Sequence, residues 1–210
     1  MVGAAPKLDV CALLDDRFSL RHDDNTHTTA THMAHIAVDP SIPGIRSLFT
    51  FRPETGVPLT RLAHVLLHGE SPLTKGEREL IAAFVSHGNK CTFCTMSHAA
   101  AARHHYGDDK DLVDEVVFKG DNSRLSPKMQ ALLVIAEKVR RGGRIVTDED
   151  VAAARAEGAV DRDIHDTVLI TAAFCMFNRY VDGLKALTPS DAETYVPMGA
   201  LMAERGYARD

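Results

Sequence analysis

Helix start and stop signals recur along the sequence, whereas alternating strand patterns and hairpin dipeptides are almost absent from it. Residues 74–88 open with Thr74 and Glu77 in the spacing of a capping box, and they end near Gly88. Residues 126–143 begin with a serine cap and a proline, and they end with two arginines followed by glycines. These signals predict an all-α fold of about six to eight helices.

Five further segments have the caps, spacing or composition of helices: residues 56–70, 89–107, 107–121, 147–158 and 162–186. In the second of these, Asn89 is the expected cap, alanines fill the body, and Gly107 is the expected stop. The last carries a broad apolar stripe over more than five turns. A helix that apolar is expected to be central or to lie at a subunit interface, so a homo-oligomer is expected.

Length and composition limit the chain to one ordinary globular domain with an appended segment. With 210 residues, 45% apolar and 25% charged, it can bury a core of normal size. Residues 1–40, rich in histidine, aspartate, threonine and proline toward their end, are expected to form an arm or loop. Residues 41–210 are expected to form the all-α domain.

Charge and hydropathy exclude two classes of partner. The formal net charge is -5 and no lysine or arginine run occurs, so a nucleic acid is not an expected partner. No apolar run approaches the roughly 20 residues that span a bilayer, and the N-terminus lacks the features of a secretory signal. No membrane partner is therefore expected, and the expected location is cytoplasmic.

Residues 91–98, CTFCTMSH, place two cysteines and a histidine where they can act together. Cys91, Cys94 and His98 are spaced three and four residues apart, so they share one face of a helix. Cys94 and His98 lie one turn apart, close enough to share a proton. Unsatisfied N–H groups and the macrodipole at a helix start stabilise a thiolate. This pattern favours a redox pair.

Two other interpretations of the same residues stay open. A structural zinc site needs four ligands, and no second CxxC or HxxxH pair follows. The other available ligands are the histidines at positions 22, 27, 32 and 35. Alternatively, both cysteines are small buried hydrophobes and His98 is a core histidine with satisfied hydrogen bonds. The redox interpretation is preferred because three such residues lie together at a helix start.

Glu79 precedes Cys91 by eleven intervening residues, and Cys94 and His98 follow. This arrangement resembles the alkylhydroperoxidase D (AhpD)-like group of the carboxymuconolactone decarboxylase superfamily, in particular its peroxidase-related branch. The similarity in order and spacing covers roughly residues 40–187. It implies an AhpD-like helical bundle, a homo-oligomer, and an antioxidant enzyme that reduces hydroperoxides with thiols and without haem, flavin or metal.

The resemblance also implies a role for each motif residue. Cys94 is expected to attack the peroxide and become a sulfenic acid, and Cys91 to resolve it as a Cys91–Cys94 disulfide. His98 is expected to accept or relay the thiol proton, and Glu79 to orient that histidine. The role of Glu79 rests on the resemblance alone. The expected partners are a small-molecule hydroperoxide and an external thiol or dithiol reductant.

Phe93 is a departure from the family pattern, because some members have a histidine between the cysteines. A shortened proton relay leaves open a dithiol–disulfide exchange or oxidant-response role. A carboxymuconolactone decarboxylase-like lyase is another alternative, but that branch does not depend on the cysteine pair. A non-enzymatic alternative is a zinc-binding module whose cysteines hold the metal.

Three residues outside the motif also stand out on the apolar helix. Asn178 and Arg179 interrupt it, and they are expected either to line the site or a subunit interface, or to lie on a solvated edge. Cys175 is expected to serve in packing, because its neighbours are aromatic and apolar.

Overall fold

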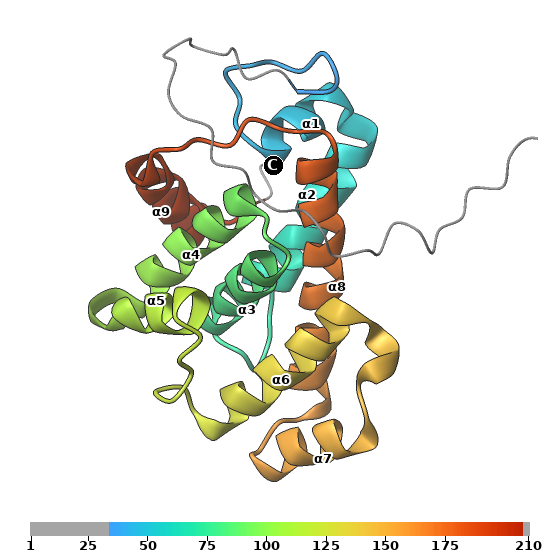
Figure 1. Cartoon of the computed structure of the whole chain (residues 1–210), viewed down its shortest axis with the longest axis vertical. Coiled ribbons are helices and arrows are strands. Elements are labelled where there is room, and N and C mark those ends of the chain that lie inside the picture. Colours follow the sequence, from blue (N-terminus) through green and yellow to red (C-terminus); the bar gives the residue numbers. More distant parts are fainter. Residues whose placement is uncertain (1–33, 208–210) are drawn as a thin grey trace, which may run out of the picture. The chain divides into compact units, whose positions relative to one another are not determined.

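The computed structural model describes residues 34–207, and the regular structure within this range is helical throughout (Figure 1). The α-helices of the described range are α1 (Ile45–Phe51), α2 (Pro53–His68), α3 (Lys75–Gly88), α4 (Thr92–Tyr106), α5 (Asp111–Phe118), α6 (Pro127–Arg141), α7 (Asp148–Ala156), α8 (Asp161–Gly183) and α9 (Tyr195–Arg205). The all-α prediction is confirmed. Most of the expected arm at residues 1–40, with Cys11, His22, His27 and His32, lies outside the described residues.

All seven segments expected to be helical form helices, and the described range contains two more, α1 and α9. Neither has a side chain that caps its N-terminus. In addition, α9 contains Pro197 and Gly199, residues that ordinarily argue against a helix. Proline is tolerated here because it lies in the first turn. Residues 34–207 therefore contain nine α-helices, where the sequence indicated six to eight helices.

The capping box at the start of α3 is formed as expected. The Thr74 hydroxyl accepts a hydrogen bond from the Glu77 N–H at 3.2 Å, and the Glu77 carboxylate accepts one from the Thr74 N–H at 2.8 Å. At the start of α6, the Ser126 hydroxyl accepts from the Met129 N–H at 3.3 Å. These bonds satisfy N–H groups that have no partner inside the helix.

The prediction that Asn89 caps α4, the helix of the motif cysteines, is wrong. Asn89 ends α3, and Cys91 is the residue before the first turn of α4. Between them, Lys90 adopts a left-handed conformation with φ of 63°, which turns the chain from one helix to the next. The Asn89 side chain donates to the side-chain oxygen Oδ1 of Asn178 at 2.9 Å instead of capping α4.

Helix α8 packs on α3 and α6 through a deeply buried face (Figure 1). Ile170, Phe174 and Val181 on this face are all at most 1% exposed. One face of this helix is therefore part of the core, which agrees with the first of the two positions expected for it. Asn178 is buried and donates to the Ser86 hydroxyl at 3.0 Å, so it belongs to an internal network. Arg179, by contrast, is exposed.

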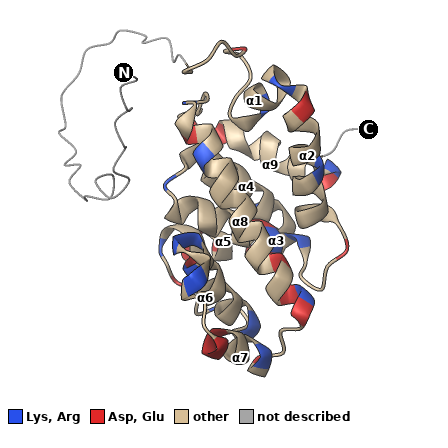
Figure 2. Cartoon of the chain, turned by 90° about the vertical axis from the view of Figure 1, so that its right-hand side faces the viewer, with Lys and Arg blue, Asp and Glu red and all other residues tan. Residues whose placement is uncertain are grey.

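Charged residues of both signs lie together on α6 and α7, whereas the ribbon of α4 is almost free of them (Figure 2). One link between α6 and α7 is the ion pair of Lys138 with Asp150, at 2.7 Å. Among the described residues, no helix combines the length and apolar character needed to cross a membrane.

Helix α9 lies against α4 at close range, and Gly199 makes this approach possible. A Cβ atom at Gly199 would lie 2.5 Å from the Cβ of Ala100 and 2.7 Å from the backbone nitrogen of Ala101. The alanines in the body of α4 present a surface small enough for this contact. Because the blocking atoms include backbone, the contact cannot be relieved by a rotamer change.

Gly199→Ala is expected to lower the free energy of unfolding by about 1 to 3 kcal/mol, because the added methyl group forces α9 away from α4. Urea denaturation measures this loss. Gly183→Ala is the matched control, since a Cβ there would meet no atom within 4 Å; its effect should stay within about 0.5 kcal/mol. Equal effects of the two substitutions would contradict the close packing of α4 and α9.

Candidate functional site

The turn between α3 and α4 fixes both motif cysteines at the start of α4. The Cys91 N–H donates to the Ser86 carbonyl at 3.0 Å, and the Cys91 carbonyl accepts from the Thr95 N–H at 3.0 Å and from its hydroxyl at 2.8 Å. Cys94 lies in the first turn of the helix. Both thiols are free, and the residues are only 0% and 3% exposed. The pair is therefore built into a closed part of the structure.

An apolar cluster surrounds the two cysteines. Its other buried members are Leu48, Phe93, Ala100, Val181, Ala186 and Tyr195. Phe93, the residue between the cysteines, packs against the Tyr195 ring at 6.0 Å between centroids. Its ring also fills the space in which a side chain at Gly44 would lie. Phe93 thus serves as an anchor of this cluster, and its ring has no group that transfers a proton.

The surroundings of Cys91 favour its protonated form. A hydrogen bond with Cys94 is the main cause of a raised pKa at Cys91, and burial and the nearby Asp182 carboxylate act in the same direction. Burial also raises the pKa of Asp182, although its hydrogen bond with the Cys91 thiol acts in the opposite direction. These effects on Cys91 act against the stabilisation of a thiolate that is expected at a helix start.

Glu79 and His98, which the sequence could not place relative to each other, are directly paired. The Nδ1 atom of His98 on α4 lies 2.7 Å from Oε2 of Glu79 on α3. Glu79 is 0% exposed and His98 is 9% exposed. With the carboxylate ionised, this contact places the proton on Nδ1 and leaves Nε2 with a lone pair that can accept another proton.

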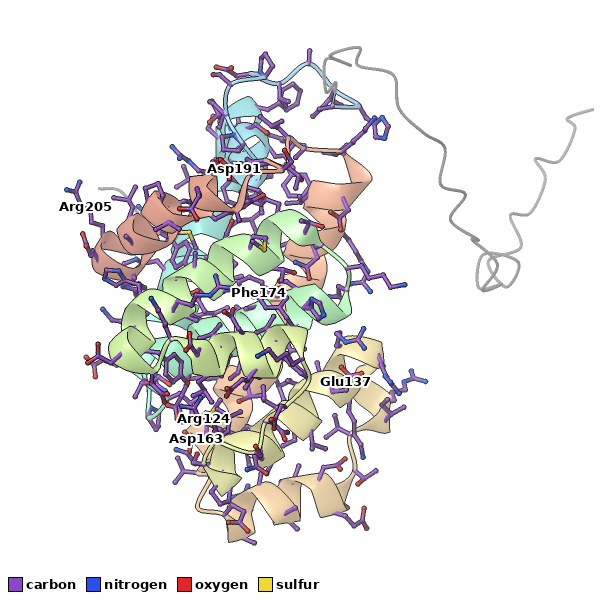
Figure 3. The ribbon with its side chains drawn as sticks, turned by 60° about the vertical axis from the view of Figure 1, so that its left-hand side comes forward. Arg124, Glu137, Asp163, Phe174, Asp191 and Arg205 are labelled. Carbon is purple, nitrogen blue, oxygen red and sulfur yellow. The ribbon has the colours of Figure 1, made fainter. Side chains whose placement is uncertain are left out.

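The ring of Phe174 holds His98 from the side of α8. The two rings meet edge to face, with 4.5 Å between their centroids. Figure 3 shows Phe174 in the middle of the helical body, behind the ribbon of α4. Two helices and an aromatic ring therefore fix the orientation of the imidazole. His98 lies one helical turn after Cys94, on the same helix.

Tyr207, just after α9, is a site residue that carried no signal in the sequence. Its hydroxyl donates to Oε1 of Glu79 at 2.5 Å, and it lies 3.3 Å from Nδ1 of His98. Burial and the Glu79 carboxylate raise the pKa of Tyr207 well above its usual value. A lone tyrosine near the end of a chain matches no motif, and only the tertiary structure brings it to Glu79.

The metal interpretation of the sequence required further ligands near the cysteines. Within residues 34–207, no three or more histidine, cysteine, aspartate or glutamate side chains are grouped so that they could hold a metal ion.

The sequence and the fold resemble those of known proteins. The sequence profile of the Carboxymuconolactone decarboxylase family matches residues 53–138. A search of curated proteins gave no match. Among solved structures, an uncharacterized peroxidase-related protein from Silicibacter sp. TM1040 is 31% identical with a TM-score of 0.67, and the similarity covers 74% of this chain and 79% of that one.

Two further solved structures share the fold. An uncharacterized peroxidase-related protein from Ralstonia eutropha JMP134, described as an alkylhydroperoxidase AhpD core, is 28% identical with a TM-score of 0.67, over 76% of this chain and 82% of that one. A protein of unknown function from Agrobacterium tumefaciens is 20% identical with a TM-score of 0.58, over 69% of this chain and 97% of that one. At that identity the last likeness concerns the fold alone.

The helical body and the paired glutamate and histidine beside a CxxC turn define a protein of the AhpD type. The chain belongs to the carboxymuconolactone decarboxylase superfamily, in its AhpD-like, peroxidase-related branch. The family expected from the sequence is thus confirmed.

Tyr195 lies in the apolar cluster around the cysteines, and its ionisation should lower the free energy of unfolding at alkaline pH. Burial, with smaller effects of Cys91 and Cys94, raises its pKa to about 12. An unfolded tyrosine ionises near pH 10, so the folded state binds more protons between about pH 10 and 12. The contribution of Tyr195 to the free energy of unfolding is therefore complete below about pH 10 and falls by roughly 2 to 3 kcal/mol as the pH approaches 12.

Urea denaturation of wild type and Tyr195→Phe between pH 8 and 12 checks this. At pH 8 the variant should be less stable by about 1 kcal/mol, because the Tyr195 hydroxyl donates to the Pro189 carbonyl at 2.9 Å. The difference should shrink and then reverse as the pH rises. A difference that stays constant up to pH 12 would contradict the raised pKa.

Proposed function

We propose that the protein is a thiol-dependent oxidoreductase that reduces hydroperoxides through Cys91 and Cys94. The observation that carries this proposal is the 2.7 Å pair of Glu79 and His98, which lies one helical turn from Cys94. A nucleophile, a base and a group that orients the base are the parts that covalent catalysis requires. A metal-binding or purely structural cysteine pair does not need a histidine oriented in this way.

In the proposed first half-reaction, the Cys94 thiol gives its proton to Nε2 of His98. The thiolate attacks one peroxide oxygen, the O–O bond breaks, and Cys94 becomes a sulfenic acid. The leaving alkoxide takes a proton, which His98 can return, and departs as an alcohol. The peroxide gains two electrons, and the Cys94 sulfur loses two.

In the second half-reaction, the Cys91 sulfur attacks the sulfenic sulfur of Cys94. The S–O bond breaks, water leaves, and the Cys91–Cys94 disulfide forms. An external thiol or dithiol then reopens the disulfide by exchange and supplies two electrons. The short helical spacing of Cys91 and Cys94 supports this step, because Cys91 directly precedes α4 and Cys94 lies in its first turn, with both side chains in one apolar cluster.

The surroundings of the cysteines favour a small or apolar substrate. Both residues are at most 3% exposed, and apolar side chains cover them. A compact or lipid-like hydroperoxide loses less hydration on entry than a charged one.

The expected cytoplasmic location of the protein stays a prediction.

Phe93 supports dithiol–disulfide exchange as a second candidate function. Its ring is buried in the apolar cluster, so it adds no proton-transfer group between the cysteines. Peroxide reduction would then depend on His98 alone for proton transfer. Slow peroxide turnover with rapid exchange against a dithiol would favour this role.

Titration of free thiols before and after one equivalent of a hydroperoxide tests the proposed chemistry. Wild type should lose two thiols per chain within minutes. Cys91→Ser should accumulate a sulfenic acid on Cys94, because the resolving thiol is missing, and Cys94→Ser should lose no thiol. Cys175→Ser is the matched control and should behave like wild type, since Cys175 lies outside the pair.

No thiol loss in the wild type would contradict peroxide reduction. The zinc-binding module would then be tested by the metal content of protein purified without added metal, and one zinc per chain would support it. Peroxide consumption that survives in Cys94→Ser but not in Cys91→Ser would reverse the proposed roles of the two cysteines.

We also propose that the protein is a homo-oligomer. Apolar side chains remain exposed on α2 and α8, among them Val57 at 53%, Val65 at 63%, Leu169 at 36% and Met176 at 43%. Burial of such side chains between subunits removes apolar surface from water. Light scattering at micromolar concentration should give a mass at least twice the 22.9 kDa of the chain. A monomer would contradict this proposal.

A further inference from the structure

Tyr207 completes the hydrogen bonding of the most deeply buried carboxylate of the candidate site. Its hydroxyl donates to Oε1 of Glu79 at 2.5 Å, while Oε2 of the same carboxylate pairs with Nδ1 of His98 at 2.7 Å. Each carboxylate oxygen therefore has its own donor. Glu79 is 0% exposed, and an ionised group that loses contact with water must find such partners inside the protein.

The backbone around Tyr207 is shaped to deliver the side chain to this point. Gly206, which ends α9, has φ of 70° and ψ of -155°, a conformation that favours glycine. A Cβ atom at Gly206 would lie 2.6 Å from Nδ1 of His64. The Tyr207 N–H donates to that same nitrogen at 3.3 Å. A glycine is thus required where the chain turns toward Glu79.

Aromatic contacts fix the ring of Tyr207 on two sides. It stacks on His98 with 5.9 Å between the ring centroids, and it meets His68 edge to face, also at 5.9 Å. Helices α2, α3 and α4 therefore all contact a residue that follows α9. A side chain needed only to cover the core would not require the hydrogen bond that the Tyr207 hydroxyl donates to Glu79.

We propose that Tyr207 is a positioning residue that keeps Glu79 ionised and oriented, so that the proton of the pair stays on Nδ1 of His98 and Nε2 remains free to act as a base. This inference rests on the proposed function for its catalytic meaning. The hydrogen bond stabilises the ionised carboxylate more than the protonated one. Without it, the Glu79–His98 pair should hold an added proton up to a higher pH.

Other groups that face Glu79 also influence the protonation of the Glu79–His98 pair. The charged and titratable neighbours of Glu79 are His68 from α2, Arg78 from α3, His98 and His105 from α4, and Tyr207 after α9. Lys75 and His64 act on His68, which lies beside this group. Burial is the main cause of lowered pKa values at His68 and His105, so both are neutral at pH 7. From α8, the neutral ring of Phe174 packs on His98.

The test follows the ring of His98 by NMR as the pH is varied, in the full chain of wild type and Tyr207→Phe. The His98 signal is assigned by its loss in His98→Ala. Tyr207→Phe should move the titration midpoint of the His98 signal to a higher pH than in wild type. Tyr106→Phe is the matched control: it removes a partly buried hydroxyl elsewhere and should leave the midpoint unchanged.

Gly206→Ala provides a second variant that keeps the tyrosine but disturbs its placement. It should shift the midpoint in the same direction as Tyr207→Phe. Thermal unfolding of each variant shows whether it is folded. A Tyr207→Phe protein that is folded, less stable and unchanged in its midpoint would overturn the proposal, because Tyr207 would then have only a packing role. An equal shift in Tyr106→Phe would overturn it as well.

The thiol titration with hydroperoxide, run on the same proteins, separates this inference from the proposed function. If both hold, the acid limb of the pH profile for thiol loss should move upward in Tyr207→Phe by the same amount as the His98 midpoint. A shifted midpoint in a protein whose thiols do not react with peroxide would support the role of Tyr207 in the pair and reject the peroxidase. Thiol loss with an unshifted midpoint would support the peroxidase and reject the role of Tyr207 in the pair.

Discussion

The buried hydrogen bond between Glu79 and His98 is the interaction on which the site depends. It joins α3 to α4 across the core, at 2.7 Å, and its carboxylate has no contact with solvent. A buried carboxylate is costly unless donors surround it, so the structure must bring several elements to one point. Helix α4 supplies His98, and the segment after α9 supplies Tyr207. The packing of α9 on α4 at Gly199 therefore affects the electrostatics of the site as well as its stability.

Helix α4 separates two environments that the proposed chemistry needs side by side. Its first turn carries the cysteines into an apolar cluster with Phe93 and Tyr195, where water is excluded. One turn further along, His98 faces a polar group of Glu79 and Tyr207. Such an arrangement places a protected sulfur close to an oriented base. The alanine-rich body of α4 is almost uncharged because residues 99–102 are buried (Figure 2).

The sequence predicted most helices because their signals are local. The capping box of Thr74 and Glu77, the Ser126 cap and the stop at Gly107 all act within one or two turns. Predictions from local preference failed at two places. Asn89 lost its expected capping role because Asn178, 89 residues away, offers its side chain a partner. The short α1 and the proline- and glycine-containing α9 form because tertiary contacts outweigh weak local preference.

For the candidate site, the sequence by itself determined the helical spacing of Cys91, Cys94 and His98, because positions on one helix are fixed by a regular geometry. Similarity to a family supplied Glu79, but not its distance from the histidine. Only the tertiary structure decided that Glu79 pairs with His98, that Tyr207 donates to the same carboxylate, and that Cys91 is fully buried. These properties arise from contacts between segments far apart in the chain and from the exclusion of water, and neither is encoded in local spacing.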